Sequence, residues 1–123
     1  MKRFVMIAML VLLAFALNSC EKDKWGFDNT VIFSADGGEK SVQGNAPVAT
    51  LAIGTNPSNK KNALDIAANL AITYDWLTAT AVKGDNEIHL IALPNNTGKD
   101  RRLHIYSKTH DEKVINITVI QKK

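Results

Sequence analysis

Apolar and polar residues alternate along three segments in the C-terminal half of the chain, residues 86–92, 102–108 and 115–119. A period of two places the apolar side chains on one face of an extended strand and the polar ones on the other. Each segment is therefore predicted to be a half-buried β-strand. Residues that favour turns separate them, as is typical of antiparallel strands, at positions 83–86, 94–100 and 109–112.

The N-terminal half shows a shorter version of the same pattern. Residues 30–34 and 39–43 are predicted to be strands, and Gly37 and Gly38 between them supply the positive φ angles that a tight turn needs. We expect these two strands to form a hairpin. Residues 47–53 are predicted to be a further strand.

The segment from residue 64 to residue 74 has apolar residues at its even positions. Residues 64–72 would also suit a short helix, and both structures remain open from the pattern alone. A strand is favoured because the run continues into the β-branched residues Ile72 and Thr73 and the aromatic Tyr74.

Short strands at this spacing, with no long helix between them, predict an all-β fold, a β-sandwich of antiparallel strands. Trp76 continues the parity of Ile72 and Tyr74, so we expect its side chain in the core. With a single cysteine, the chain has neither a disulfide framework nor a CxxC site, and the fold must be held by its core.

The first residues predict a lipoprotein signal peptide over residues 1–19. Lys2 and Arg3 precede an apolar run over residues 4–17, which is shorter than the roughly 20 apolar residues of a membrane span. Asn18 and Ser19 separate this run from Cys20, which is the predicted site of lipidation. Residues 20–27 then form the lipidated cysteine and a tether, and residues 28–123 form the folded domain.

Removal of the predicted signal peptide would change the net charge of the chain. The full chain has 15 Lys and Arg residues and 12 Asp and Glu residues, and loss of Lys2 and Arg3 leaves 13 against 12. A charge near +1 gives no strong basic field, so no nucleic-acid partner is predicted. The predicted location is the cell envelope, with the protein anchored through Cys20 to the outer membrane.

Four short motifs occur in an order that resembles the BACON domain, the Bacteroidetes-associated carbohydrate-binding often N-terminal domain. They are residues 33–38, Asp75-Trp76-Leu77, the loop 95–98 that leads to Arg101, Leu103 and Ile105, and Val119-Ile120-Gln121. The resemblance spans most of residues 30–121. It implies an immunoglobulin-like β-sandwich, exported by a Bacteroidetes-type bacterium, in a family attached to carbohydrate-active enzymes or surface lipoproteins. The role it implies is glycan binding.

Sugar recognition by a β-sandwich needs aromatic rings beside polar groups. By parity, Tyr106 lies on the polar face of its strand, and Trp25 and Phe27 precede the first strand, where they are either exposed or packed on the sandwich. If strand 86–92 pairs with strand 102–108, one solvent-facing surface gathers the candidate binding residues Glu87, His89, Arg102, His104 and Tyr106. The alternative is an ordinary solvated sheet face.

No catalytic site is predicted. Nucleophilic catalysis needs a Ser or Cys beside a His with an orienting acid, and no such set is visible. His89 and His104 lack a third ligand for a metal, so neither a metal nor a cofactor is predicted. The sequence thus predicts a non-catalytic lipoprotein that binds carbohydrate at the cell surface. The alternative is a structural spacer or an interaction module that docks an envelope protein near the membrane.

Overall fold

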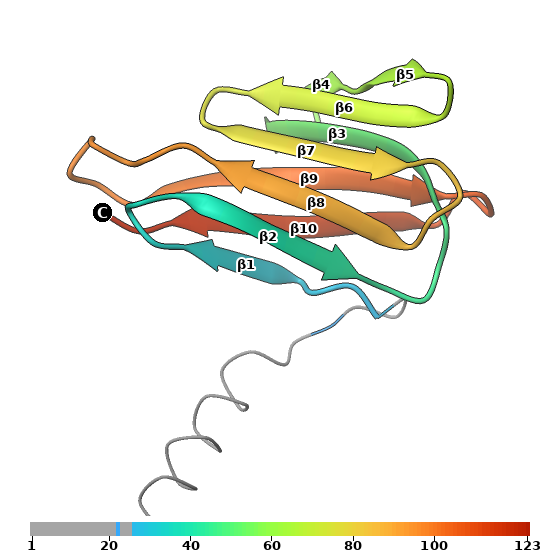
Figure 1. Ribbon diagram of the computed structural model, residues 1–123, viewed down its shortest axis with the longest axis horizontal. Helices are drawn as coiled ribbons and strands as arrows, with labels where there is room; N and C mark the ends of the chain where they lie inside the picture. Colours follow the sequence, from blue (N-terminus) through green and yellow to red (C-terminus); the bar gives the residue numbers. More distant parts are fainter. Residues whose placement is uncertain (1–21, 23–25) are drawn as a thin grey trace, which may run out of the picture.

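Two five-stranded sheets pack face to face in a β-sandwich (Figure 1). The computed structural model describes Lys22 and residues 26–123, and no helix occurs among them. The sheet that we call the β9 sheet has the order β1-β10-β9-β3-β4, and the β7 sheet has the order β2-β8-β7-β6-β5. The strands are β1 (Thr30–Phe33), β2 (Gly38–Gln43), β3 (Val48–Asn56), β4 (Asn59–Asn62), β5 (Leu64–Ile66), β6 (Asn69–Tyr74), β7 (Leu77–Val82), β8 (Glu87–Ala92), β9 (Arg101–Thr109) and β10 (Val114–Gln121).

The predicted all-β, immunoglobulin-like sandwich is confirmed, and its core is built by the alternation read from the sequence. Inward-facing residues of both sheets are fully buried, among them Ile53, Leu77, Ile88, Leu90, Ile105, Ile115 and Ile117. Each such side chain contributes about 1.5–3 kcal/mol when it leaves water. The strands predicted at 47–53, 86–92, 102–108 and 115–119 correspond to β3, β8, β9 and β10.

The prediction of a hairpin from residues 30–34 and 39–43 is wrong. Both strands form, but β1 pairs in parallel with β10, while β2 pairs antiparallel with β8 in the opposite sheet. The turn between them therefore crosses from one layer to the other. Gly37 has φ +76°, and a Cβ at this position would meet the Ala92 carbonyl oxygen. The glycine does serve a turn, but an alternating pattern does not distinguish a turn within a sheet from one between sheets.

Residues 64–74 are extended and not helical, as predicted. They form two strands, β5 and β6, where one was expected. Ala67 and Ala68 both have positive φ angles, 50° and 70°, and make a two-residue turn between β5 and β6. Such a turn moves the outward positions from even to odd numbers. Leu64 therefore points outward and is 70% exposed, whereas Leu70 is buried.

One end of the sandwich is joined by the amide of Gln121, which is fully buried. Its Nε2 donates to the carbonyl of Ser34 at 3.1 Å and to that of Leu93 at 2.7 Å, and its Oε1 accepts from Arg101 Nε at 2.8 Å. Ser34 lies in the turn between the layers and Leu93 follows β8 of the β7 sheet. Since Gln121 belongs to β10, a single side chain links both sheets.

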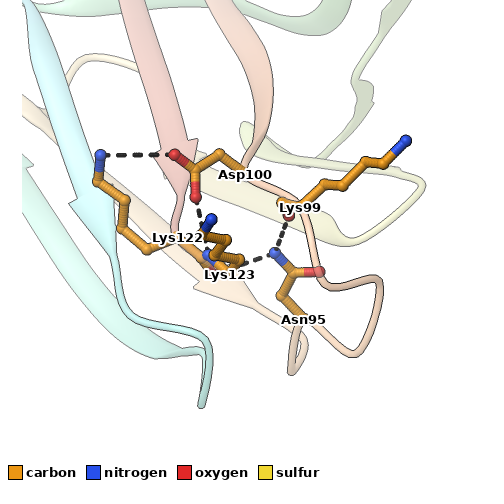
Figure 2. A network of polar contacts seen from close by, with 5 residues as sticks. All are labelled: Asn95, Lys99, Asp100, Lys122 and Lys123. Atoms are coloured by element: carbon orange, nitrogen blue, oxygen red, sulfur yellow. Dashed lines mark hydrogen bonds and ion pairs between the residues drawn. The ribbon is translucent and has the colours of Figure 1, made fainter.

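The loop after Leu93 is fixed onto the C-terminal residues (Figure 2). Asn95 Nδ2 donates to the carbonyls of Lys99 at 2.7 Å and Lys122 at 3.0 Å. Asp100 Oδ1 accepts from the Lys123 backbone N–H at 2.9 Å, and its other oxygen lies 3.7 Å from Lys122 Nζ. These contacts stabilise the connection by which the chain passes from β8 to β9.

Trp76 lies in the core, as predicted, and is only 4% exposed. The Arg101 guanidinium carbon lies 4.8 Å from the centre of its ring. The same guanidinium donates to the carbonyls of Leu93 and Pro94. Arg101 therefore covers the ring of Trp76 and also belongs to the hydrogen-bond network of Gln121.

We expect Trp76→Ala to lower the free energy of unfolding by about 3–5 kcal/mol, because it leaves a large cavity in the core. Urea unfolding followed by circular dichroism measures the loss. Leu64→Ala, at an exposed position, serves as a control and should stay within about 0.5 kcal/mol of the parent. A Trp76→Ala protein of unchanged stability would contradict the core assignment.

We expect Gln121→Leu to cost about 3 kcal/mol, although the residue keeps its size, because several buried polar groups lose their partner. The same unfolding measurement applies. Gln43→Leu on the exposed face of β2 is the matched control and should be close to neutral. Equal stability of the two variants would show that the network contributes little.

Candidate functional site

The two groups of candidate residues lie on opposite faces of the molecule. β8, with Glu87 and His89, pairs with β2 and β7, whereas β9, with Arg102, His104 and Tyr106, pairs with β10 and β3. The predicted pairing of strand 86–92 with strand 102–108 is therefore wrong. The chain between them, residues 93–100, crosses between the layers instead of turning back within one sheet (Figure 1).

On the β7 sheet, Glu87 and His89 are engaged with each other and with β2. His89 Nε2 lies 2.9 Å from Glu87 Oε1, and His89 Nδ1 lies 2.9 Å from Ser41 Oγ. Gln43 Nε2 donates to Glu87 Oε2 at 3.4 Å. These side chains satisfy one another on a sheet face, which fits the ordinary solvated surface weighed as the alternative.

On the β9 sheet, Tyr106 points outward as its parity predicts, but it is not exposed. Only 9% of the residue is accessible, and burial raises the pKa of its phenol. Lys60 Nζ lies 5.6 Å from the ring centre, and the ring of His104 lies 6.1 Å away. The expectation of an exposed aromatic platform at Tyr106 is therefore wrong, because neighbouring side chains cover the ring.

His104 is half-buried beside Tyr106, and its Nδ1 lies 3.2 Å from Thr118 Oγ1. Burial, and secondarily the charge of Arg102, hold the pKa of His104 below its ordinary value of 6.5. The imidazole is therefore neutral at pH 7, and Arg102 is the exposed cation beside it on β9.

A cleft of about 530 Å³ opens next to Tyr106. It forms where β4 ends: Ala63 N–H still donates to the Leu51 carbonyl at 2.8 Å, and the chain then crosses to β5 in the other sheet. Because the chain leaves the β9 sheet at this point, the side of the sandwich beside β3 is left open. The polar side chains that line the cleft are Thr50, Lys60, Asn62, Asp65, Lys83, Tyr106, Ser107, Lys108 and Asn116.

Several polar groups in the cleft are available to a ligand. The side-chain amides of Asn62 and Asn116 are exposed and make no hydrogen bond to another described residue. The Tyr106 hydroxyl also has no such partner. Because no fully buried polar side-chain atom of the described residues is unsatisfied, this oxygen is open to solvent. Amides and a hydroxyl lining a concave site are groups that hydrogen-bond to sugar hydroxyls.

One carboxylate in the cleft is already neutralised. Asp65 Oδ2 lies 2.7 Å from Lys83 Nζ, and this contact lowers the pKa of Asp65. Lys60 and Lys108 have no carboxylate partner among the described residues. Parity along one strand places Tyr106 and Lys108 on the same face, but it does not reveal Lys60, Asn62 and Asn116 beside them, because strand pairing determines which residues meet there.

Two candidate residues, Cys20 and Trp25, lie outside the described residues. Phe27, which the sequence assigns to the tether, is fully buried in the core. In the described part of the chain, no helix is long and apolar enough to cross a bilayer. His, Cys, Asp and Glu side chains do not gather there in a group that would hold a metal ion.

Comparison with known proteins identifies similar folds. No protein-family profile matches the chain, and no curated protein matches it. An NMR structure of a protein from Bacteroides thetaiotaomicron is 16% identical, has a TM-score of 0.52, and matches over 85% of this chain and 89% of that chain. A Bacteroides ovatus GH5 xyloglucanase in complex with a XXXG heptasaccharide is 18% identical, with a TM-score of 0.50. That match covers 76% of this chain but 17% of the enzyme. At these identities the similarity shows the fold alone.

We expect the environment of His104 to make the domain less stable in mild acid. Above pH 6.5 the imidazole is neutral in both folded and unfolded chains. Below it, the unfolded chain takes up the proton more readily, so stability falls as the pH decreases toward the lowered pKa of the folded state. Thermal melts at about pH 7.5 and about pH 5.5 should show a larger loss in the parent than in His104→Gln. An identical pH dependence in the two proteins would contradict this prediction.

Proposed function

We propose that this protein is a non-catalytic lipoprotein of the cell envelope, and that its β-sandwich binds carbohydrate in the cleft beside Tyr106. The observation that carries the proposal is the cleft itself, which presents the unpaired amides of Asn62 and Asn116 and the Tyr106 hydroxyl. A sugar chain offers hydroxyl groups that both donate and accept hydrogen bonds, as do these amides.

The fold comparison supports this proposal at the level of architecture. The GH5 xyloglucanase is an enzyme bound to a heptasaccharide, and the part of it that matches this chain is a minor fraction of its length. A fold of this kind therefore occurs as a segment of a protein described as a xyloglucanase. The resemblance of the sequence motifs to the BACON domain supports the same role.

The anchoring part of the proposal rests on the sequence. The apolar run over residues 4–17 ends just before Cys20. Lipidation at Cys20 would hold the domain at the outer membrane, since each buried lipid CH₂ contributes about 0.8 kcal/mol and more than one chain is needed for stable anchoring.

A second candidate function, the docking of an envelope protein, is favoured by one observation. β5 is an edge strand whose residues Leu64 and Ile66 are 70% and 68% exposed. An open strand edge with apolar side chains suits addition of an extended segment of a partner. This function would depend on Leu64 and Ile66 and would be unaffected by changes in the cleft.

Affinity electrophoresis in gels containing soluble polysaccharides tests the proposed function. We expect at least one polysaccharide to slow the migration of the parent protein, in a panel that includes neutral xyloglucan and acidic polygalacturonate. The double variant Asn62→Ala/Asn116→Ala should bind roughly tenfold more weakly or worse, because two hydrogen bonds of about 1 kcal/mol each are lost. Tyr106→Phe should weaken binding less, and it avoids the cavity that alanine would leave.

Asn96→Ala is the matched control, since this exposed amide lies in the loop at 93–100 and outside the cleft. It should bind as the parent does. Undiminished retardation of the double variant would place the glycan elsewhere and contradict the proposed site. Absence of retardation of the parent by every polysaccharide would contradict carbohydrate binding altogether.

A further inference from the structure

Charge is divided unequally between the two sheets. The strands of the β9 sheet contain Lys60, Lys61, Arg101, Arg102 and Lys108 and neither aspartate nor glutamate. The β7 sheet holds carboxylates on β2, β5 and β8. The chain has a formal net charge of +3, and in one of its layers the charged side chains on the strands are all cationic.

Two of these cations lie at the cleft. Lys60 and Lys108 both line it and are exposed, and neither is paired with a carboxylate of a described residue. The ammonium of Lys60 is held over the Tyr106 ring. The one lining carboxylate, Asp65, is occupied by Lys83. The cleft therefore has a net positive charge that the described residues do not compensate.

The cleft provides little aromatic stacking surface. Tyr106 is the one aromatic residue among the described residues that line it, and its ring is almost fully covered. A neutral sugar would thus find hydrogen bonds in this cleft but no exposed ring face for its C–H groups. The two unpaired lysines therefore offer the strongest single contacts in the cleft, because charge-assisted hydrogen bonds are roughly twice as strong as neutral ones.

We infer that the glycan bound in this cleft is acidic, with carboxylate or sulfate groups that pair with Lys60 and Lys108. This inference rests on the proposed function and names its ligand class. Asn62 and Asn116 would contact the sugar hydroxyls, and the two lysines would contact the anionic substituents. Arg102, exposed on the same face of β9, extends the positive surface beyond the cleft.

Other polyanions fit the geometry less well. Single-stranded nucleic acid gains affinity by stacking bases on aromatic side chains, and Tyr106 does not offer its face. A bilayer surface is flat, whereas the lysines surround a concave cleft of about 530 Å³ that also presents amides. A sugar chain is narrow enough to enter such a cleft.

A matched pair of polysaccharides provides the test. Polygalacturonate and its methyl ester share one backbone and differ in charge, as do dextran sulfate and dextran. In affinity electrophoresis of the full-length protein, we expect at least tenfold tighter binding to the acid than to the ester. Raising NaCl from about 0.05 M to about 0.5 M should remove most of this difference, because salt screens exposed charges.

The variant Lys60→Gln/Lys108→Gln should lose the preference for the acid and keep its unfolding midpoint. Lys99→Gln/Lys123→Gln has the same net charge, with both changes at the Asn95 end of the molecule (Figure 2), and should bind like the parent. Binding to dextran sulfate but not to polygalacturonate would support an anionic ligand and assign sulfate as its charged group.

Three results would overturn the inference. Equal binding to acid and ester would show that charge is not recognised, and it would leave the proposed glycan binding intact. Binding to none of the four polysaccharides would remove both proposals. Tighter, lysine-dependent binding to vesicles with phosphatidylglycerol or to single-stranded DNA would transfer the site to a different class of partner.

Discussion

The buried amide of Gln121 is the interaction on which the two-layer arrangement depends at one end. The described domain has no cysteine, so its layers are joined by packing and hydrogen bonds. Gln121 accepts a hydrogen bond from Arg101 within its own sheet. It donates to the carbonyls of Ser34 and Leu93, which lie on two of the connections between the layers. A buried network of this kind stabilises a fold when every member is satisfied and is costly when one is lost. No buried polar side-chain atom in the described residues lacks a partner.

The sequence motifs on which the proposed BACON resemblance rests contribute residues to this end of the sandwich. Trp76, Asn95, Arg101 and Gln121 are far apart in sequence and meet at one end of the sandwich. Their roles are to cover the core, to fix a loop and to join the sheets. These residues therefore have structural roles, and the proposed binding site consists of other residues. The cleft lies at the edge where β4 gives way to β5, and its lysines and asparagines are absent from the motifs.

Much of the fold follows from the sequence, and little of the site does. Alternation predicts β8, β9 and β10 because each buries one face, and it places Trp76 inside. β4 is missed because all its residues, Asn59–Asn62, are polar and exposed, so it has no alternation to detect. The pairing errors share a cause: Gly37 and the loop at 93–100 look like hairpin turns but cross between the layers. Because the predicted strand pairing is wrong, it groups His89 and Glu87 with Tyr106 and leaves out Lys60 and Asn62.

The parallel pairing of β1 with β10 has a consequence for how the domain is assembled. β1 is the first strand to be synthesised and β10 the last, and Val31 pairs with Val119 across nearly the whole domain. Contacts between residues so distant in sequence slow folding, because a long loop must close before they form. β1 therefore has no partner strand until β10 has been synthesised, and this edge of the β9 sheet forms only when β10 joins it.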